Sequence, residues 1–275
     1  MTLQAVDYRK KPRFAVDLNF DGGEGFDDEP LMEYAASVNI ACGGHTGDEI
    51  SMRKATRIAL RRFVAINAHP AYQDAPGFGR EAVQVSPEEL ELSLLTQIET
   101  LRNIVRQEEG ELTGVKPHGA LYHEAARNPE VAGVVARAAW AVSPRLILIT
   151  SPGSRLVEAG AEVGMIVAIE GFADRGYRSD GSLVPRDQPG ALVTNPNAAV
   201  DQALSIVREG RVKTTGGGYY DLKVDTLCLH GDTPGARDIA RAVRAALLEA
   251  EVVVRPLRGW KPKGPDPGPP PLPRA

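Results

Sequence analysis

Ionisable and amide side chains recur in this sequence directly after short apolar runs, a placement that could assemble a chemical site. The runs continue into VDLNFDGGEG, NIACGGHTGD, NAHPAYQD, VKPHGALY, IEGFADRGY and LHGD. Carboxylates, histidines and a lysine around one pocket suit proton transfer to and from a carbonyl or amide substrate, because their pKa values can be shifted towards neutrality. The residue types therefore favour an enzyme that acts on a carbonyl or amide.

The side chains in these segments divide into candidates for catalysis and candidates for substrate binding. The catalytic candidates are Asp17, His45, His69, Lys116, His118, Glu170 and His230. The substrate-binding candidates are Asn19, Asp21, Glu24, Asn39, Asp48, Tyr122, Asp174, Arg175, Tyr177 and Asp232. A strand-end lysine such as Lys116, when partly buried, can polarise a carbonyl or stabilise an oxyanion. The fifth histidine, His123, follows Tyr122 at a helix start and is expected at the surface.

Cofactor sites are less clearly marked. Asp17, His45 and His69 are of the ligand types that a hydrolytic divalent metal takes, but no HxxxH or HxxEH spacing supports a site directly. The glycine-rich strings GGEG and GGG match neither dinucleotide nor ATP phosphate loops, so the chain has no recognisable ATP phosphate loop of its own. Taken singly, Asp17 could also cap a turn, and His45 or His69 could be structural. Cys42 and Cys228 are expected to be buried, reduced thiols.

Strands alternating with amphipathic helices must position these side chains. Apolar runs predict strands at 14–18, 37–41, 64–68, 114–116, 146–149, 166–169 and 226–229, with 252–254 as an eighth. Helices are predicted near 49–62, 87–108, 129–141, 154–163, 198–209 and 234–249. Two of these helices are predicted to start with a capping residue followed by proline. Ser86 precedes Pro87 in the second helix, and Thr233 precedes Pro234 in the last. In a β/α barrel or an open parallel sheet, the ends of all strands converge on one face, so one shared site is predicted.

Composition and length restrict the remaining classes. The 275 residues fit one large domain or two small ones, and a net charge of -4 provides no basic field for nucleic acid or anionic membranes. No apolar run is long enough to span a bilayer and no secretory signal is present, so a cytoplasmic protein is expected. We expect an N-terminal leader at 1–13, one barrel-like domain at 14–257 and a disordered proline-rich tail at 258–275. The long connection 172–195 is expected to be functional.

In this order and spacing, the motifs resemble the LamB/YcsF family, whose characterised role is that of the A subunit in the bacterial ATP-hydrolysing 5-oxoprolinase. The strings VDLNFDGGEG, NIACGGHTGD, AHPAYQD with FGR, VKPHGALY, FADRGYRSDGSLVPR and CLHGD carry the resemblance. It runs from about residue 14 to 254. Phe20 and Gly23, and likewise Gly44 and Thr46, depart from the family's usual DLNADLGEG and NIACGFHAGD.

The resemblance implies a distorted β/α barrel of seven or eight parallel strands, similar to the glycoside hydrolase and deacetylase superfamily. It implies opening of the lactam of 5-oxo-L-proline to L-glutamate with ATP hydrolysis to ADP and phosphate, in a complex with 5-oxoprolinase subunits B and C. Residues and resemblance together suggest Asp17 or His69 as general base, Lys116 and His118 as stabilisers of negative charge, and Arg175 as a carboxylate clamp. His230 with Asp232 would protonate the leaving nitrogen.

Two other functions stay open on the sequence. The first is a stand-alone metal-dependent deacetylase of a sugar or amide, with Asp17, His45 and His69 as ligands and no need for ATP. The second is a non-catalytic regulatory subunit that binds its partner through the barrel surface or the proline-rich tail. The density of ionisable residues at one predicted face favours an enzyme over a regulatory subunit.

Overall fold

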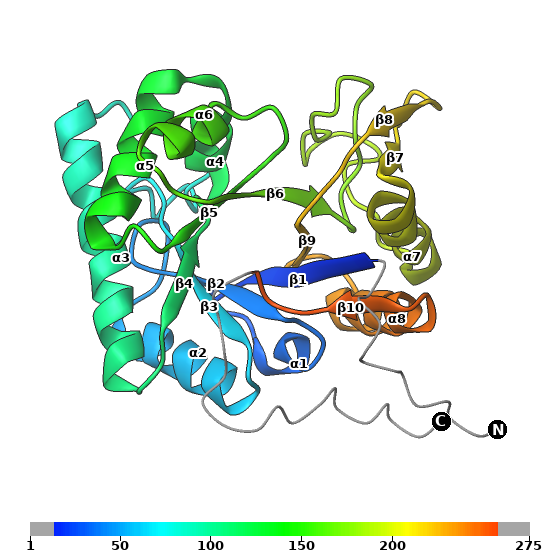
Figure 1. Cartoon of the computed structure of the whole chain (residues 1–275), viewed down its shortest axis with the longest axis horizontal. Helices are drawn as coiled ribbons and strands as arrows, with labels where there is room; N and C mark the ends of the chain where they lie inside the picture. The colour runs from blue at the N-terminus through cyan, green and yellow to red at the C-terminus, as the bar shows by residue number, and fades with distance from the viewer. Residues whose placement is uncertain (1–13, 258–275) are drawn as a thin grey trace.

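Parallel strands close into a barrel in the computed structural model, which describes residues 14–257 (Figure 1). The strands of the closed sheet are, in order, β1 (Phe14–Gly22), β2 (Ser37–Ala41), β3 (Ala65–His69), β4 (Leu112–Val115), β5 (Ile147–Thr150), β6 (Val167–Phe172) and β9 (Thr226–His230). β9 pairs with both β6 and β1 and so closes the ring. The additional strand β10 (Val252–Val254) pairs in parallel with the first three residues of β1. The predicted barrel of seven or eight parallel strands is confirmed; the expected leader and tail lie outside the described residues.

Helices surround the barrel largely where the sequence predicts them. They are α1 (Glu29–Met32), α2 (Glu49–Arg61), α3 (Pro87–Gln107), α4 (Gly119–Arg127), α5 (Pro129–Val142), α6 (Arg155–Glu162), α7 (Pro196–Leu204) and α8 (Ala236–Glu249). Ser86 caps α3 as expected, in a reciprocal capping box with Glu89. The expected cap at Thr233 is wrong, because α8 begins at Ala236, after Gly235 in a left-handed conformation. No described helix is long and apolar enough to cross a membrane.

The long connection after β6 is ordered by a small antiparallel hairpin. The π-helical turn η1 (Ser205–Glu209) leads into β7 (Arg211–Lys213), which pairs with β8 (Tyr219–Asp221). A parallel bridge joins Tyr177 of the connection to Thr214 of the hairpin turn. Figure 1 shows this hairpin beside α7. Neither strand is among those predicted from the sequence, since each has only three residues and a mixed polar pattern.

The barrel interior is polar along β1, because alternate residues of a strand face opposite sides of the sheet. Val16, Leu18 and Phe20 belong to the apolar core. Asp17 and Asn19, which alternate with them, and Asp21, which follows Phe20, are hydrogen-bonded to side chains of other strands across the interior. This alternation creates a polar column, and Asp21 at its upper end lies where β1 finishes.

Candidate active site

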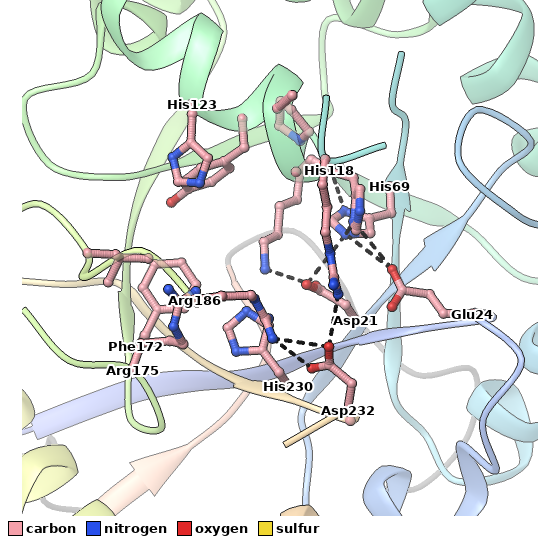
Figure 2. Close-up of a pocket in the computed structure, with 18 of the residues that line it drawn as sticks. Asp21, Glu24, His69, His118, His123, Phe172, Arg175, Arg186, His230 and Asp232 are labelled. Carbon is pink, nitrogen blue, oxygen red and sulfur yellow. Dashed lines mark hydrogen bonds and ion pairs between the residues drawn. The ribbon is translucent and has the colours of Figure 1, made fainter. Parts of the chain in front are cut away.

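A cavity of about 440 Å³ opens at the carboxyl ends of the strands (Figure 2). Its polar lining comes from the ends of β1, β3, β4 and β9, with the segments that follow them, and from the connection after β6. The polar residues that line it are Asp21, Glu24, His69, Arg80, Lys116, His118, Tyr122, His123, Arg175, Arg186, His230 and Asp232. Phe172, Leu183, Val184 and Pro185 add an apolar wall. The predicted convergence of strand-end residues on one face is therefore present in the structure.

Lys116 is the charged residue at the bottom of this cavity. Its Nζ lies 2.8 Å from Asp21 Oδ1, 3.0 Å from Glu170 Oε1 and 3.2 Å from Cys228 Sγ. Burial disfavours the ammonium, but the negative charge of Asp21 above all, with Glu170 beside it, raises the pKa of Lys116 well above its usual value. The residue is therefore a fixed cation at neutral pH, able to stabilise negative charge that develops on a bound substrate.

His69 and His118 face each other with their outer nitrogens fixed by backbone carbonyls. His69 Nδ1 lies 2.7 Å from the Lys116 carbonyl, and His118 Nε2 lies 2.9 Å from the Phe78 carbonyl. Since a carbonyl only accepts, both of these nitrogens carry a hydrogen. The inner nitrogens, His69 Nε2 and His118 Nδ1, are 2.9 Å apart and would present two lone pairs to each other if both rings were neutral. The geometry therefore requires either a shared proton or a cation between the rings.

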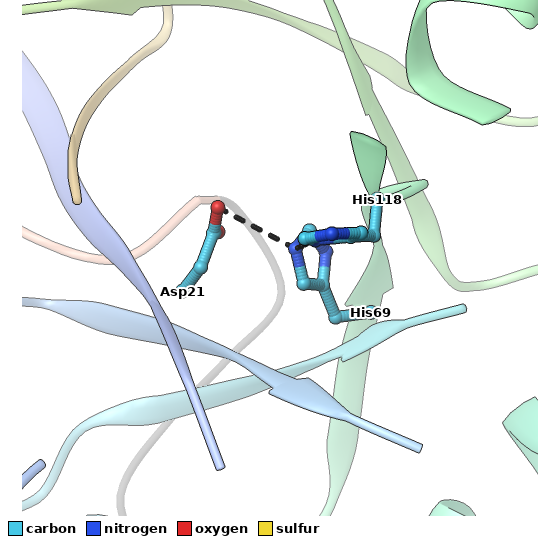
Figure 3. A group of neighbouring side chains, drawn as sticks. All are labelled: Asp21, His69 and His118. Atoms are coloured by element: carbon cyan, nitrogen blue, oxygen red, sulfur yellow. Dashed lines mark hydrogen bonds and ion pairs between the residues drawn. The ribbon is translucent and has the colours of Figure 1, made fainter. Parts of the chain in front are cut away.

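Two carboxylates, Asp21 and Glu24, surround the same point, and Figure 3 shows Asp21 beside the two rings. Asp21 Oδ2 lies 3.4 Å from His69 Nε2, and Glu24 Oε1 lies 3.3 Å from His118 Nδ1. Burial opposes their ionisation, but His69 and Lys116 hold the pKa of Asp21 well below its usual value, and hydrogen bonds from His118 and His45 do the same for Glu24. The Asp21 carboxylate in turn raises the pKa of His69 against the effect of burial.

His45 lies behind this pair instead of on the cavity wall. Its ring stacks on His118 with centroids 3.6 Å apart and planes at 2°, and its Nε2 contacts Glu24 Oε1 at 2.9 Å. Burial lowers the pKa of His45 to about 4, so the ring is neutral at pH 7. His45 therefore positions Glu24 and His118.

These donors fit a divalent metal. Asp21, His69 and His118 each offer one ligand atom, all within 4.8 Å of one another, and Glu24, His45 and His118 form a second such group. The hydrogen bonds from the outer nitrogens of His69 and His118 to carbonyls are those that orient histidine ligands towards a metal. A third such group consists of Asp21, Cys228 and His230. Asp17, one of the three expected ligands, belongs to none of the three groups, so the candidate ligands of the structure differ from the expected set.

His230 forms its ion pair with Asp174, which differs from the expected pairing. His230 Nδ1 lies 3.0 Å from Asp174 Oδ1, and Thr233 Oγ1 donates to the same carboxylate. Burial would raise the pKa of Asp174, but His230 holds it below its usual value. Asp232, the expected partner of His230, instead contacts Arg80 and Arg186. The structure therefore contradicts the His230–Asp232 pair.

Several expected site residues lie away from the cavity. Asp17 is at the lower end of the polar column, where Ser37 and Thr226 donate to its Oδ2. Asn19, Asn39 and Glu170 lie between Asp17 and the cavity; Asn39 contacts Asp21, and Glu170 contacts Lys116. Asp48 caps α2 at the surface, and Tyr177 accepts a hydrogen bond from the Phe172 backbone. Asp17, Asp48 and Tyr177 therefore have structural contacts instead of cavity contacts.

The cavity residues that were not among the expected site residues include three cationic or titratable side chains and one aromatic ring: Arg80, His123, Arg186 and Phe172. His123 is exposed, but the space that it faces is this cavity. Phe172 stacks on His230 with ring centroids 5.5 Å apart. Arg80 and Arg186 belong to the FGR and FADRGYRSDGSLVPR strings that carry the family resemblance, and their place in these strings was the available signal.

Fold and site together define an α/β-barrel protein with a polar cavity at the carboxyl ends of its strands, the position of active sites in barrel enzymes. The family model described as the LamB/YcsF family matches residues 16–262. The chain belongs to the LamB/YcsF family, and the expected resemblance is confirmed.

Relatives agree with this assignment over nearly their whole length. A protein of Chloroflexus aggregans, named as the A subunit of 5-oxoprolinase, is 47% identical over 250 residues, which are 89% of this chain and 99% of the relative. The crystal structure of a lactam utilization protein from Thermus thermophilus has a TM-score of 0.83 and 40% identity, covering 88% of this chain and 99% of that one. A putative cellobiose-phosphate cleavage protein from Enterococcus faecalis shares the fold, with a TM-score of 0.52 and 12% identity over 88% and 96% of the two chains.

Proposed function

We propose that this chain is the lactam-opening subunit of an ATP-dependent 5-oxoprolinase. It converts 5-oxo-L-proline to L-glutamate in a complex with subunits B and C, with hydrolysis of ATP to ADP and phosphate. The names of the Chloroflexus and Thermus relatives support the substrate class and the existence of further subunits. The observation in this chain that carries the proposal is a cavity with Lys116 and two histidines at one end and Arg175 at the other.

Substrate binding follows from the charges of the cavity. The carboxylate of 5-oxoproline is an anion, and Arg175 offers a guanidinium at the cavity wall. The lactam oxygen carries partial negative charge, which becomes the full charge of a phosphoryl group when this oxygen is phosphorylated, and Lys116 is the fixed cation that stabilises this negative charge. The apolar wall around Phe172 would cover the methylene groups of the ring. Each end of the small ring thereby receives a group of matching polarity.

Proton transfer falls to the histidines. Asp17 is too far down the barrel to contact a ligand in the cavity, so we assign the base to the His69–His118 pair. In the metal-free site this pair, on losing its shared proton, presents an imidazole lone pair to the attacking water, and Asp21 and Glu24 hold the rings in place. A metal held by the same two nitrogens would take the place of the shared proton, so the base function of the pair belongs to the metal-free site. His230, oriented by Asp174, is the group that donates a proton to the leaving ring nitrogen.

The requirement for ATP follows from the chemistry of the lactam. Amide resonance, visible in a rotational barrier of about 18–20 kcal/mol, makes the lactam carbonyl a poor electrophile. Phosphorylation of the lactam oxygen by ATP, with release of ADP, would remove this resonance. Water then adds to the carbon, and expulsion of phosphate and cleavage of the C–N bond leave L-glutamate. Because the chain has no recognisable ATP phosphate loop, we assign ATP binding to the complex with subunits B and C.

A divalent metal is part of the proposal as a cofactor held by Asp21, His69 and His118, with Glu24 adjacent. When bound, such an ion supplies Lewis acidity towards a carbonyl or a bound water. The residues around it keep their other functions: the backbone carbonyls of Lys116 and Phe78 fix the ring tautomers, and Glu24 neutralises part of the added charge.

The same donor set favours one alternative, an amide hydrolase that uses the metal and needs no ATP. Reconstitution separates the two functions. The chain is purified alone and with subunits B and C, and glutamate formed from 5-oxo-L-proline is measured with and without ATP, and after chelation. The proposal predicts ATP-dependent glutamate formation only in the complex, and loss of this activity in Lys116→Met. Turnover by the chain alone without ATP would favour the alternative, and no turnover in any combination would overturn the proposal.

A non-catalytic regulatory subunit would give a third result in the same assay. Cavity variants would then leave the activity of the complex unchanged. Arg137→Gln, on the outer face of α5 in an ion pair with Glu91 of α3, is the matched control because it removes an arginine far from the cavity. Equal activity in Lys116→Met and Arg137→Gln would favour the regulatory function.

A further inference from the structure

Asp232 lies between two arginines that come from different loops at the mouth of the cavity. Its Oδ2 is 2.9 Å from Arg80 Nη2 and 3.1 Å from Arg186 Nη1 (Figure 2). Arg80 follows β3, Arg186 belongs to the connection after β6, and Asp232 follows β9. All three line the cavity, and their side chains are 24–47% exposed. A carboxylate of the chain itself therefore occupies the position where these two guanidinium groups meet.

Arg175 adds a third guanidinium on the same side of the cavity. Its Nε donates to the Ala191 carbonyl and its Nη2 donates to the Val184 carbonyl. Among the described residues, no carboxylate lies within ion-pair distance of it, although only 6% of its surface is exposed. Burial and the nearby Arg186 lower the pKa of Arg175. A buried cation with neutral partners alone is costly, and an anion in the cavity would offset that cost.

The charges on this side of the cavity are unbalanced. Arg80, Arg175 and Arg186 contribute three positive charges, and Asp232 contributes one negative charge. The other nearby carboxylate, Asp174, is bound to His230 and Thr233. At the opposite end of the cavity, Lys116 already has Asp21 and Glu170. The excess positive charge is therefore confined to the mouth.

We propose that Arg80, Arg175 and Arg186 form an anion subsite in which Asp232 acts as an internal competitor. The ligand is an oxyanion that carries two negative charges, either a phosphate group or a dicarboxylate, and it displaces the Asp232 carboxylate from Arg186 and Arg80. Arginine forks suit both ligands, because they donate two parallel hydrogen bonds to a carboxylate or a phosphate. The inference deepens the proposed function and rests on it only for the choice of L-glutamate as the dicarboxylate.

The test removes each partner of the Arg186–Asp232 ion pair in turn, and the inference predicts opposite effects of the two variants on anion affinity. The full chain is titrated calorimetrically with inorganic phosphate and, separately, with L-glutamate. Arg186→Gln removes donors to the anion and should weaken binding about tenfold, the usual cost of a lost charge-assisted hydrogen bond. Asp232→Asn removes the competitor and should tighten binding by about the same factor. The matched controls, Arg137→Gln and Glu91→Gln, remove the two partners of an ion pair between outer helices and should leave binding unchanged.

The two ligands distinguish the source of the anion, since phosphate binding alone indicates a phosphate group and glutamate binding alone indicates a dicarboxylate. Circular dichroism verifies that each variant is folded, and Arg80→Gln replaces Arg186→Gln if the latter does not fold. Binding of neither ligand to the wild type, or equal or weaker binding in Asp232→Asn, would overturn the inference. Binding does not depend on lactam opening, so a failed 5-oxoprolinase assay with intact anion binding would count against the proposed function alone.

Discussion

At the scale of single residues, the buried charges of the barrel compensate one another closely. Lys116 is 3% exposed, and its ammonium lies between the carboxylates of Asp21 and Glu170. The second oxygen of Glu170, Oε2, has no hydrogen-bond partner among the described residues. Removing one member of a buried ion pair leaves the others uncompensated in a region of low dielectric. Lys116 therefore contributes to stability as well as to the chemistry of the cavity, and the two contributions can be separated.

Replacing Lys116 with methionine should lower the free energy of unfolding by about 3–5 kcal/mol, because Asp21 and Glu170 are left as buried charges. The double variant Lys116→Met with Glu170→Gln should recover part of this loss but none of the activity. Turnover should fall by about 100-fold or more in both variants, as for loss of an oxyanion donor. Urea unfolding and glutamate formation by the reconstituted complex measure the two effects. Recovery of activity in the double variant would contradict the role assigned to Lys116.

Asp17 makes stability depend on pH. Burial raises the pKa of Asp17 to about 7 from the ordinary value of 3.8. The folded chain therefore binds this proton more tightly than the unfolded chain, and stability falls as pH rises from about 4 to 7, then stays level. The full loss is on the order of 4 kcal/mol.

In Asp17→Asn, the difference in unfolding free energy between pH 5 and pH 8 should be smaller than in the wild type. Urea unfolding at the two pH values measures it, and Asp48→Asn, at the exposed cap of α2, serves as control. An identical pH dependence in Asp17→Asn and the wild type would show that Asp17 does not hold the proton.

At the scale of elements, glycines in the loops allow the histidines to approach one another. Gly79 has a φ of +66°, and a Cβ there would lie 2.7 Å from His45 Cβ and 2.9 Å from His118 Cδ2. Gly153, between β5 and α6, has a similar φ of +69°, but no atom lies within 4 Å of the position of its Cβ. The two positions therefore share the backbone strain of a substitution and differ only in packing.

Gly153→Ala should cost about 1–2 kcal/mol of stability from backbone strain alone. Gly79→Ala should cost roughly a further 1–3 kcal/mol from overpacking, and it should also lower activity by displacing His118. Thermal unfolding and the glutamate assay report both effects. Equal stability and activity in the two variants would mean that the loop after β3 moves aside without disturbing the histidines.

The sequence predicted the elements better than it predicted their ends. Seven apolar runs gave strands of the barrel, and the run at 252–254 coincides with β10. β1 continues four residues beyond its predicted end, since Asn19 and Asp21 interrupt the apolar run but face the interior of the barrel. A pattern of hydrophobicity cannot distinguish a polar residue that ends a strand from one that points into a polar barrel.

The location of the candidate site could be predicted from the sequence, but the hydrogen-bond and ion-pair partners of its side chains could not. Strand-end positions brought His69, Lys116, His118 and His230 together, as expected from the convergence of parallel strands. The partners of these side chains depend on loop paths: Asp232 is two residues from His230, yet it contacts Arg186 of a distant loop. Asp17 has the residue type of a catalytic base, and only its depth in the barrel assigns it another role.

At the scale of the whole molecule, ligand binding at the histidine cluster should stabilise the entire fold. A ligand present at 100 times its dissociation constant adds about 2.7 kcal/mol to the free energy of unfolding. After chelation, addition of Zn²⁺ should therefore raise the thermal midpoint of the wild type. His118→Asn should abolish this shift, and His123→Asn, on the opposite side of the cavity, should retain it. A shift of equal size in His118→Asn would place the metal elsewhere.

The pairing of β1 also determines when the barrel can form. β1 is the first described strand, but it pairs with β10 through Phe14 and Val252 and with β9 through Asp17 and Thr226. Such contacts between distant parts of a chain slow folding, and unpaired strand edges favour aggregation. During synthesis, β1 can find β2 early, but its other edge stays open until nearly the whole domain has left the ribosome. The open edge of β1 is therefore the part of the nascent chain that is exposed to aggregation until the last strands emerge.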